Sequence, residues 1–138
     1  LFRLGFRIAS SIDHQEQLMR TAGAPKGTVI IASSVSGRNQ QLANTLAIAG
    51  EYEVGRIALT RPHSPIAQQS DVLLPIDVPE QPDVLRPSSS RYAFLATVDV
   101  LAQCVATRIS AQAVANMRRI KHQLIVNRDG DDSQALGD

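Results

Sequence analysis

Residues 28–50 read TVIIASSVSGRNQQLANTLAIAG, and this stretch decides the fold. Its first part, residues 28–33, is an apolar run rich in β-branched side chains, which predicts a buried strand of a parallel sheet. Its last part, residues 37–50, places Leu42 and Leu46 on one helical face and predicts an amphipathic helix. The stretch is therefore a strand, a serine-rich turn and a helix.

Further elements alternate on either side of this stretch. The sequence predicts strands at 6–9, 54–60 and 72–76, and helices at 14–22, from residue 64, at 88–108 and at 110–126. Gly5 is suited to end a helix and Asp13 to begin one. The alternation predicts an α/β fold with a doubly wound parallel sheet, helices on both faces and right-handed crossovers. Ligands bind such sheets at the carboxyl ends of the strands.

The composition indicates one globular domain with no bias toward nucleic acid. The chain has 138 residues, 43% hydrophobic and 20% charged, with a net charge of +1. Its one cysteine, Cys104, cannot form an internal disulfide, and we expect it to be a core residue. We expect no membrane segment and no signal peptide, and therefore a cytoplasmic location. The chain opens on Leu1 and is expected to be a fragment of a longer polypeptide.

The turn at residues 34–40 is a candidate phosphate cradle. Backbone N–H groups at a helix start lack internal partners, and the helix dipole makes that end partly positive. Gly37 allows close approach of the backbone, Arg38 adds a charge, and Ser34, Ser36 and Asn39 add short polar side chains. These residues have an alternative role, because a serine-rich turn can serve only to cap its own helix. Spacing alone leaves both interpretations open.

Two segments resemble the SIS (sugar isomerase) domain family. The segment VIIASSVSGRNQQL (29–42) is similar to the family signature, a strand followed by Ser-x-Ser/Thr-Gly-x-Thr, with Asn39 in place of the threonine. The segment IALTRPHSPIAQQSDVLLPI (57–76) is also similar to the family pattern. The resemblance implies a flavodoxin-like SIS fold over residues 1–127 that lacks its first strand. The polar and acidic composition of residues 128–138 predicts a disordered tail. The resemblance also implies that Ser34, Ser36, Gly37, Arg38 and Asn39 bind a sugar phosphate.

The segment DVPEQPDVLRPSSSRYAFLATVDVLA (77–102) is similar to the HexR branch of RpiR-type transcriptional regulators. That resemblance implies an upstream helix-turn-helix domain that binds DNA and a SIS domain that senses an acidic sugar phosphate. It ranks 2-keto-3-deoxy-6-phosphogluconate first among effectors. It also makes Ser89 and Ser90 second-tier ligand residues, although a serine at this place is also suited to cap the following helix. His63 is a further candidate, on a loop after a strand.

The alternatives differ in what the loops must supply. A phosphosugar isomerase needs a general base near the reacting carbons, and no glutamate follows the serine loop. A flavodoxin-like response module needs an acidic cluster after a strand, which the sequence lacks. We therefore predict a sensor with no catalytic residue, no cofactor and no metal ligand. The helix at 92–109 is apolar nearly all round, which favours a homodimer or higher oligomer, with complete burial inside one domain as the alternative.

Overall fold

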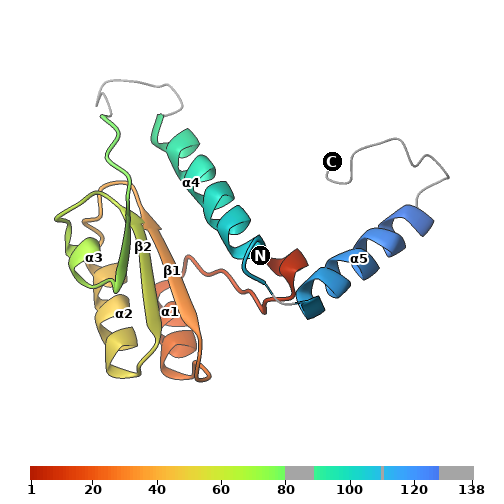
Figure 1. Ribbon diagram of the computed structural model, residues 1–138. Coiled ribbons are helices and arrows are strands. Elements are labelled where there is room, and N and C mark those ends of the chain that lie inside the picture. Colours follow the sequence, from red (N-terminus) through yellow and green to blue (C-terminus); the bar gives the residue numbers. More distant parts are fainter. Residues whose placement is uncertain (80–88, 110, 128–138) are drawn as a thin grey trace. The chain divides into compact units, whose positions relative to one another are not determined.

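The computed structural model describes residues 1–79, 89–109 and 111–127 (Figure 1). Along the chain the elements are η1 (Phe2–Leu4), α1 (His14–Ala22), β1 (Val29–Ser34), α2 (Gln40–Glu51), β2 (Gly55–Thr60), α3 (Pro65–Gln68), β3 (Val72–Pro75), α4 (Ser89–Ala106) and α5 (Ala111–Val126). They fall into two units, Ser10–Val98 on the one hand and Leu1–Ala9 with Asp99–Asp138 on the other. The predicted tail at 128–138 lies outside the described residues.

The sheet is parallel, as the sequence predicts. Its strands lie in the order β1-β2-β3, and β2 pairs in parallel with both neighbours. The register sets Ser34, at the end of β1, directly opposite Thr60, at the end of β2. The carboxyl ends of these two strands therefore meet, and the loops that follow them start side by side. The predicted α/β class is confirmed.

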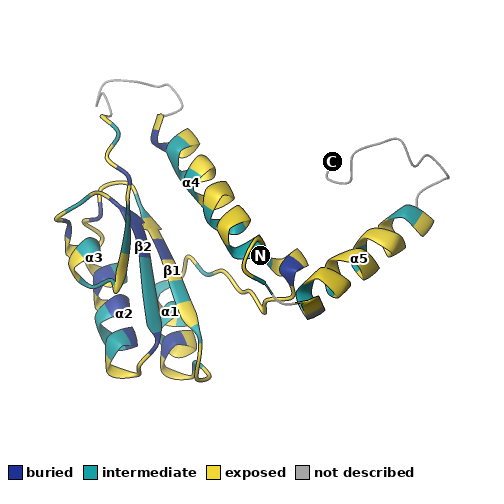
Figure 2. Cartoon of the chain, viewed as in Figure 1, coloured by how far each residue is buried: buried dark blue, intermediate teal, exposed yellow. Residues whose placement is uncertain are grey.

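One face of the sheet forms the core of this unit together with α2 and α3. Ala32 of β1 and Ala58 of β2 are buried against Leu46 of α2 and Ile66 of α3. Figure 2 shows the buried residues gathered on these strands and helices. Leu46, Ala58 and Ile66 have no exposed surface. The small alanines on the strands leave room for Leu46 of α2 and Ile66 of α3 to pack against the sheet.

The other face of the sheet departs from the prediction of a buried strand. Side chains alternate between the two faces along β1, and the residues that face away from α2 are open to solvent. Val29 is 52% exposed and Ile31 is 42% exposed. The prediction of complete burial is therefore wrong for these two residues. Helices on this second face stay a prediction.

Residues 6–9 do not form the predicted strand. A strand exists only through hydrogen bonds to a neighbour, and β1, β2 and β3 pair only with one another in the part of the chain that the structure describes. Phe6 and Ile8 are 48% and 52% exposed. The prediction of a strand at residues 6–9 is therefore wrong.

Local capping chemistry follows the sequence closely. Gly5 adopts the left-handed conformation, with a φ of 92°, and ends η1. The Asp13 side chain accepts a hydrogen bond from the Glu16 N–H at 2.8 Å and begins α1. Ser64 caps α3 in the same way through the Ala67 N–H, with Pro65 at the first helical position. These short-range predictions are confirmed.

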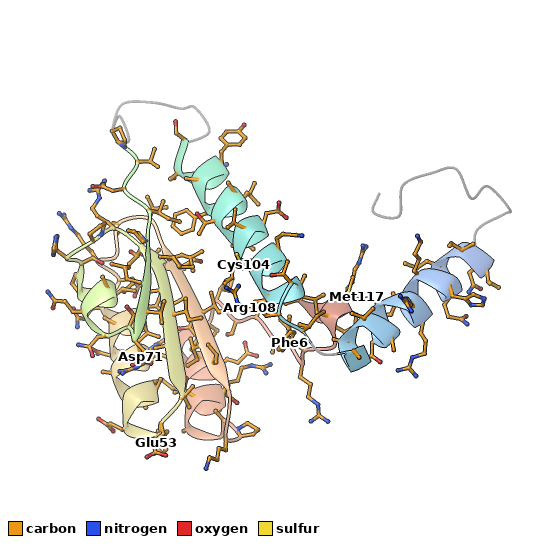
Figure 3. The ribbon with its side chains drawn as sticks, in the orientation of Figure 1. Phe6, Glu53, Asp71, Cys104, Arg108 and Met117 are labelled. Carbon is orange, nitrogen blue, oxygen red and sulfur yellow. The ribbon has the colours of Figure 1, made fainter. Side chains whose placement is uncertain are left out.

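An ion pair ties the amino ends of β2 and β3 together. Asp71 precedes β3, and one of its carboxylate oxygens accepts from the Arg56 backbone N–H at 2.8 Å and from the Arg56 Nε at 3.2 Å. The Arg56 guanidinium holds the pKa of the Asp71 carboxyl below its ordinary value. Figure 3 shows Asp71 and Glu53 toward the same end of the sheet. Since Glu53 precedes β2, this charge pair lies at the end opposite the serine loop.

Helix α4 is largely exposed within the single chain. Tyr92 and Leu95 are each 68% exposed, and Val100 is 62% exposed. Burial of these residues inside the domain, one of the two sequence alternatives, is therefore wrong. Cys104, labelled in Figure 3, is also exposed, so the prediction that it is a core residue is wrong. No helix in the described ranges is long and apolar enough to cross a membrane.

Candidate functional site

The serine loop lies where the sequence places it, between β1 and α2. Ser34 is the last residue of β1, and α2 begins at Gln40, with Asn39 as its N-cap. The helix starts three residues later than predicted, because Gly37 has a φ of +66° and cannot belong to a right-handed helix. The loop thus follows the carboxyl end of β1 and leads to the positive end of the α2 dipole.

The polar side chains of the loop accept hydrogen bonds from the loop's own backbone. The Ser34 Oγ accepts from the Gly37 N–H at 3.2 Å, and the Ser36 Oγ accepts from the Arg38 N–H at 3.3 Å. The Asn39 Oδ1 accepts from the Leu42 N–H at 3.0 Å. The capping interpretation is therefore realised in the structure. It leaves the hydroxyl hydrogens of both serines and the Asn39 amide hydrogens as donors for an anion.

Gly37 is buried and closely surrounded. A methyl group built at its Cα would lie 2.1 Å from the Ser64 Oγ and 2.6 Å from the Thr60 Oγ1. Its positive φ is a second reason why a larger residue is strained here. The glycine therefore serves to bring the serine loop into direct contact with the loop that follows β2.

Three buried residues at the end of β2 and the start of α3 hold the serine loop in place. The Thr60 hydroxyl donates to the Ser34 carbonyl oxygen at 2.6 Å. The Ile66 N–H donates to the Gly37 carbonyl oxygen at 3.2 Å, and Ser64 packs against Gly37. The sequence analysis singled out Ser64 only as the start of a helix and did not single out Thr60 or Ile66. The Thr60 contact follows from the register, since Ser34 and Thr60 end adjacent parallel strands.

Exposed charges surround the carboxyl ends of the strands. Arg38 lies on the serine loop with its side chain exposed. Arg61 follows β2 and pairs with Asp77, which follows β3, with an Nε to Oδ1 distance of 3.0 Å. His63, on the same loop as Arg61, is exposed and has a φ of 60°. Among the described residues, two arginines and one paired carboxylate give this edge a net positive charge, which suits an anionic ligand.

The second-tier serines open α4. Ser89 is its first residue and is exposed, whereas Ser90 is 1% exposed. Their role toward a ligand stays a prediction. Two surface hollows are described, lined by residues of η1, α5 and the segment after η1, and neither includes the serine loop. The described residues contain no group of three or more histidine, cysteine, aspartate or glutamate side chains that could hold a metal.

The comparisons with known proteins point to one family. The model of the SIS domain family matches residues 1–104. The transcriptional regulator HexR of Escherichia coli is 32% identical over 127 residues, which cover 92% of this chain and 44% of the regulator. HexR of Pseudomonas aeruginosa is equally similar, with 45% of its length covered. The chain thus spans less than half the length of these curated relatives.

Other similar proteins differ in their described roles. The bifunctional protein glk of Burkholderia pseudomallei is 34% identical over 110 residues, which cover 80% of this chain and 17% of that protein. Among solved structures, one similar to this chain is the NanR protein of Vibrio vulnificus complexed with ManNAc-6P, with a TM-score of 0.75 and 21% sequence identity. The match covers 91% of this chain and 47% of the NanR chain. The sugar isomerase domain of an RpiR transcription factor from Sphaerobacter thermophilus matches with a TM-score of 0.68 and 24% sequence identity. This match covers 88% of this chain and 66% of the RpiR chain. These structures establish a shared fold.

Proposed function

Since this chain belongs to the SIS domain family, we propose that it is the phosphosugar-sensing domain of a bacterial transcriptional regulator of carbohydrate metabolism. The observation that carries the proposal is the similarity to two HexR regulators over 92% of the chain. The similarity includes the serine loop and α2, the part of the fold best suited to bind an anion. A regulator of this kind acts in the bacterial cytoplasm.

The proposed ligand site is the serine loop. The phosphate would accept hydrogen bonds from the hydroxyls of Ser34 and Ser36 and from the Asn39 amide, with the backbone near Gly37 close to it. The first-turn N–H groups of α2 and the exposed Arg38 supply positive potential on the same side. Ser89 and Ser90 are second-tier contacts to the sugar. We rank 2-keto-3-deoxy-6-phosphogluconate first, in line with the resemblance to the HexR branch.

Sensing fits this site better than isomerisation does. Moving a proton between two sugar carbons requires a general base within hydrogen-bond reach of the substrate. The described part of the loop region offers hydroxyls, an amide, arginines and a single histidine, His63, and its carboxylate Asp77 is paired with Arg61. Glu80, a further carboxylate that follows Asp77 in the sequence, lies outside the described residues.

We further propose that the protein forms homodimers through α4. The helix carries large apolar side chains that the single chain leaves open: Tyr92, Leu95, Val98 and Val100. Large apolar side chains exposed along one helix are typical of subunit contacts, and cyclic dimers are the commonest oligomers. In such a dimer, α4 of one copy would pack against α4 of the other and bury these apolar side chains.

The dimer is testable by sedimentation velocity at micromolar concentration. We expect a dimer for the wild type and a monomer for Leu95→Asp, because a charge placed in an apolar contact remains without a partner. Gln15→Glu, which adds a charge at an exposed polar position of α1 and not of α4, is the control and should leave the dimer intact. A wild type that sediments as a monomer at high micromolar concentration contradicts the proposal.

The regulatory function is testable by a gel-shift titration with the full-length protein. We expect it to bind operator DNA through an upstream helix-turn-helix domain. A six-carbon acidic sugar phosphate should change that affinity roughly 5- to 150-fold, the usual range of allosteric coupling. An effector shifts DNA binding only through its different affinities for the two DNA-binding states, so sugars without phosphate serve as controls. Turnover of an aldose phosphate with no effect on DNA binding would favour the isomerase instead.

A further inference from the structure

We propose that Thr60 is a positioning residue for the phosphate-binding loop, acting through the Ser34 carbonyl rather than through the ligand. The inference rests on the function proposed above. It assigns a role to a residue outside the serine loop, on a neighbouring strand. The Thr60 hydroxyl and the Ile66 N–H each hold one carbonyl oxygen of the serine loop, at 2.6 Å and 3.2 Å.

These two bonds fix the orientation of two peptide groups. In a planar trans peptide the C=O and the following N–H point in opposite directions. With the Ser34 carbonyl held toward β2, the Val35 N–H points away from β2. With the Gly37 carbonyl held toward α3, the Arg38 N–H points away from α3. Thr60 and Ile66 thus hold two carbonyl oxygens on their own side and leave two N–H groups on the opposite side. One is that of Val35, and the other is that of Arg38, which donates to the Ser36 Oγ in the ligand-free chain.

That orientation matters for an anion. A carbonyl oxygen carries partial negative charge and repels phosphate, whereas an N–H group attracts it. Backbone dipoles that are already oriented need no rearrangement when the ligand arrives, and therefore bind it more tightly. If the peptide between Ser34 and Val35 rotated, the site would exchange an attractive dipole for a repulsive one.

Burial makes Thr60 an effective anchor. Thr60 has no exposed surface, and Ser64 beside it is 6% exposed, so water competes little for the Ser34 carbonyl. The same hydroxyl lies next to the place where a side chain on Gly37 would have to fit. Thr60 therefore holds the carbonyl group of the first loop residue, Ser34, and also limits the space next to the Cα of Gly37.

The decisive variant is Thr60→Val, which keeps the β-branched shape and removes the hydroxyl. We expect affinity for 2-keto-3-deoxy-6-phosphogluconate and for inorganic phosphate to fall about ten-fold, since partners that orient binding groups have effects of roughly 10- to 100-fold in metal sites. The affinities for the two ligands should fall by the same factor, because the substitution changes the loop that binds the phosphate group common to both. Thr60→Ser restores the hydroxyl and should bind within about two-fold of the wild type, as expected if the hydrogen bond is what matters.

Thr21→Val is the matched control. Thr21 is 3% exposed, and its hydroxyl also donates to a backbone carbonyl, that of Gln17 at 2.7 Å within α1. The change removes the same kind of buried hydrogen bond away from the loop. Thermal denaturation should show a loss of stability in both valine variants, but only Thr60→Val should lose affinity. Should Thr60→Val fail to fold, Thr60→Ala removes the same hydroxyl with less bulk.

A spectrum of the ligand-free protein tests the positioning independently of any ligand. In ¹H–¹⁵N spectra, Thr60→Val should broaden or shift the amide signals of Val35, Gly37 and Arg38, whereas Thr21→Val should not. A wild type that binds no sugar phosphate overturns the proposed function, and the loop amides still decide whether Thr60 orients the loop. A Thr60→Val variant with wild-type affinity and unchanged loop amides overturns the positioning role itself.

Discussion

Replacing Gly37 by alanine is expected to abolish sugar-phosphate binding and to destabilise the domain. The left-handed backbone conformation alone costs an L-residue about 1–2 kcal/mol. The new methyl group would also lie 2.1 Å from the Ser64 Oγ, which is far inside the van der Waals contact distance of a carbon and an oxygen atom. Ser64 is buried and caps α3, so it has little room to retreat, and the serine loop must move instead. We expect overpacking to add about 1–3 kcal/mol to the loss of stability.

Gly27→Ala separates the two causes. Gly27 also has a positive φ, of 84°, but nothing lies within 4 Å of the position that its methyl group would take. This variant should lose stability through its backbone conformation alone and retain full affinity. For Gly37→Ala we expect more than a hundred-fold loss of affinity by calorimetry, equivalent to over about 2.7 kcal/mol. Wild-type affinity in a folded Gly37→Ala variant would contradict the proposed loop.

Much of the fold is predictable from the sequence, because the signals are local. The caps at Asp13 and Ser64 and the glycine turn at Gly5 depend on a few neighbouring residues, and all three are confirmed. The strand at 28–33 is found one residue later, as Val29–Ser34. Hydrophobic periodicity and short-range hydrogen bonds decide these features, and both can be read from the sequence.

Features that depend on a distant partner are less predictable. Residues 6–9 have the alternation of a strand, but pairing needs a neighbour that the pattern does not identify. The exposure of Leu95 on α4 and that of Ile31 on β1 depend likewise on what covers them. An apolar pattern predicts that a surface needs covering. It does not predict whether the same chain provides the cover.

In the candidate site, too, the features set by local sequence are predictable and those that depend on a distant partner are not. The position of the serine loop follows from the strand, turn and helix around it, and the structure has it there. Thr60 is the residue that sequence reasoning missed, although the segment IALT that contains it was part of the family resemblance. Its importance follows from the register that sets it opposite Ser34. A strand-end hydroxyl beside a ligand loop is therefore the signal to look for in similar sheets.

The double substitution Ser34→Ala with Ser36→Ala is expected to weaken sugar-phosphate binding by roughly thirty-fold or more. Each hydroxyl that donates to a phosphate oxygen contributes about 1–3 kcal/mol, and two such bonds lost together give at least about 2 kcal/mol. Both substitutions also free a loop N–H, since the serine oxygens accept from Gly37 and Arg38. Calorimetry with 2-keto-3-deoxy-6-phosphogluconate measures the effect. Ser33→Ala is the control, because the exposed Ser33 side chain points to the opposite face of β1 and should not affect binding.

Ser36→Asp distinguishes capping from ligand binding at the same position. The aspartate keeps an oxygen that can accept from the Arg38 N–H, so the loop should stay folded if capping is the main role of Ser36. It also replaces a donor by a negative charge, which repels a phosphate at hydrogen-bond distance. We therefore expect near wild-type stability in thermal denaturation, together with a loss of binding at least as large as that of the double alanine variant. Retained affinity in Ser36→Asp would show that Ser36 only caps the loop and that the phosphate binds elsewhere.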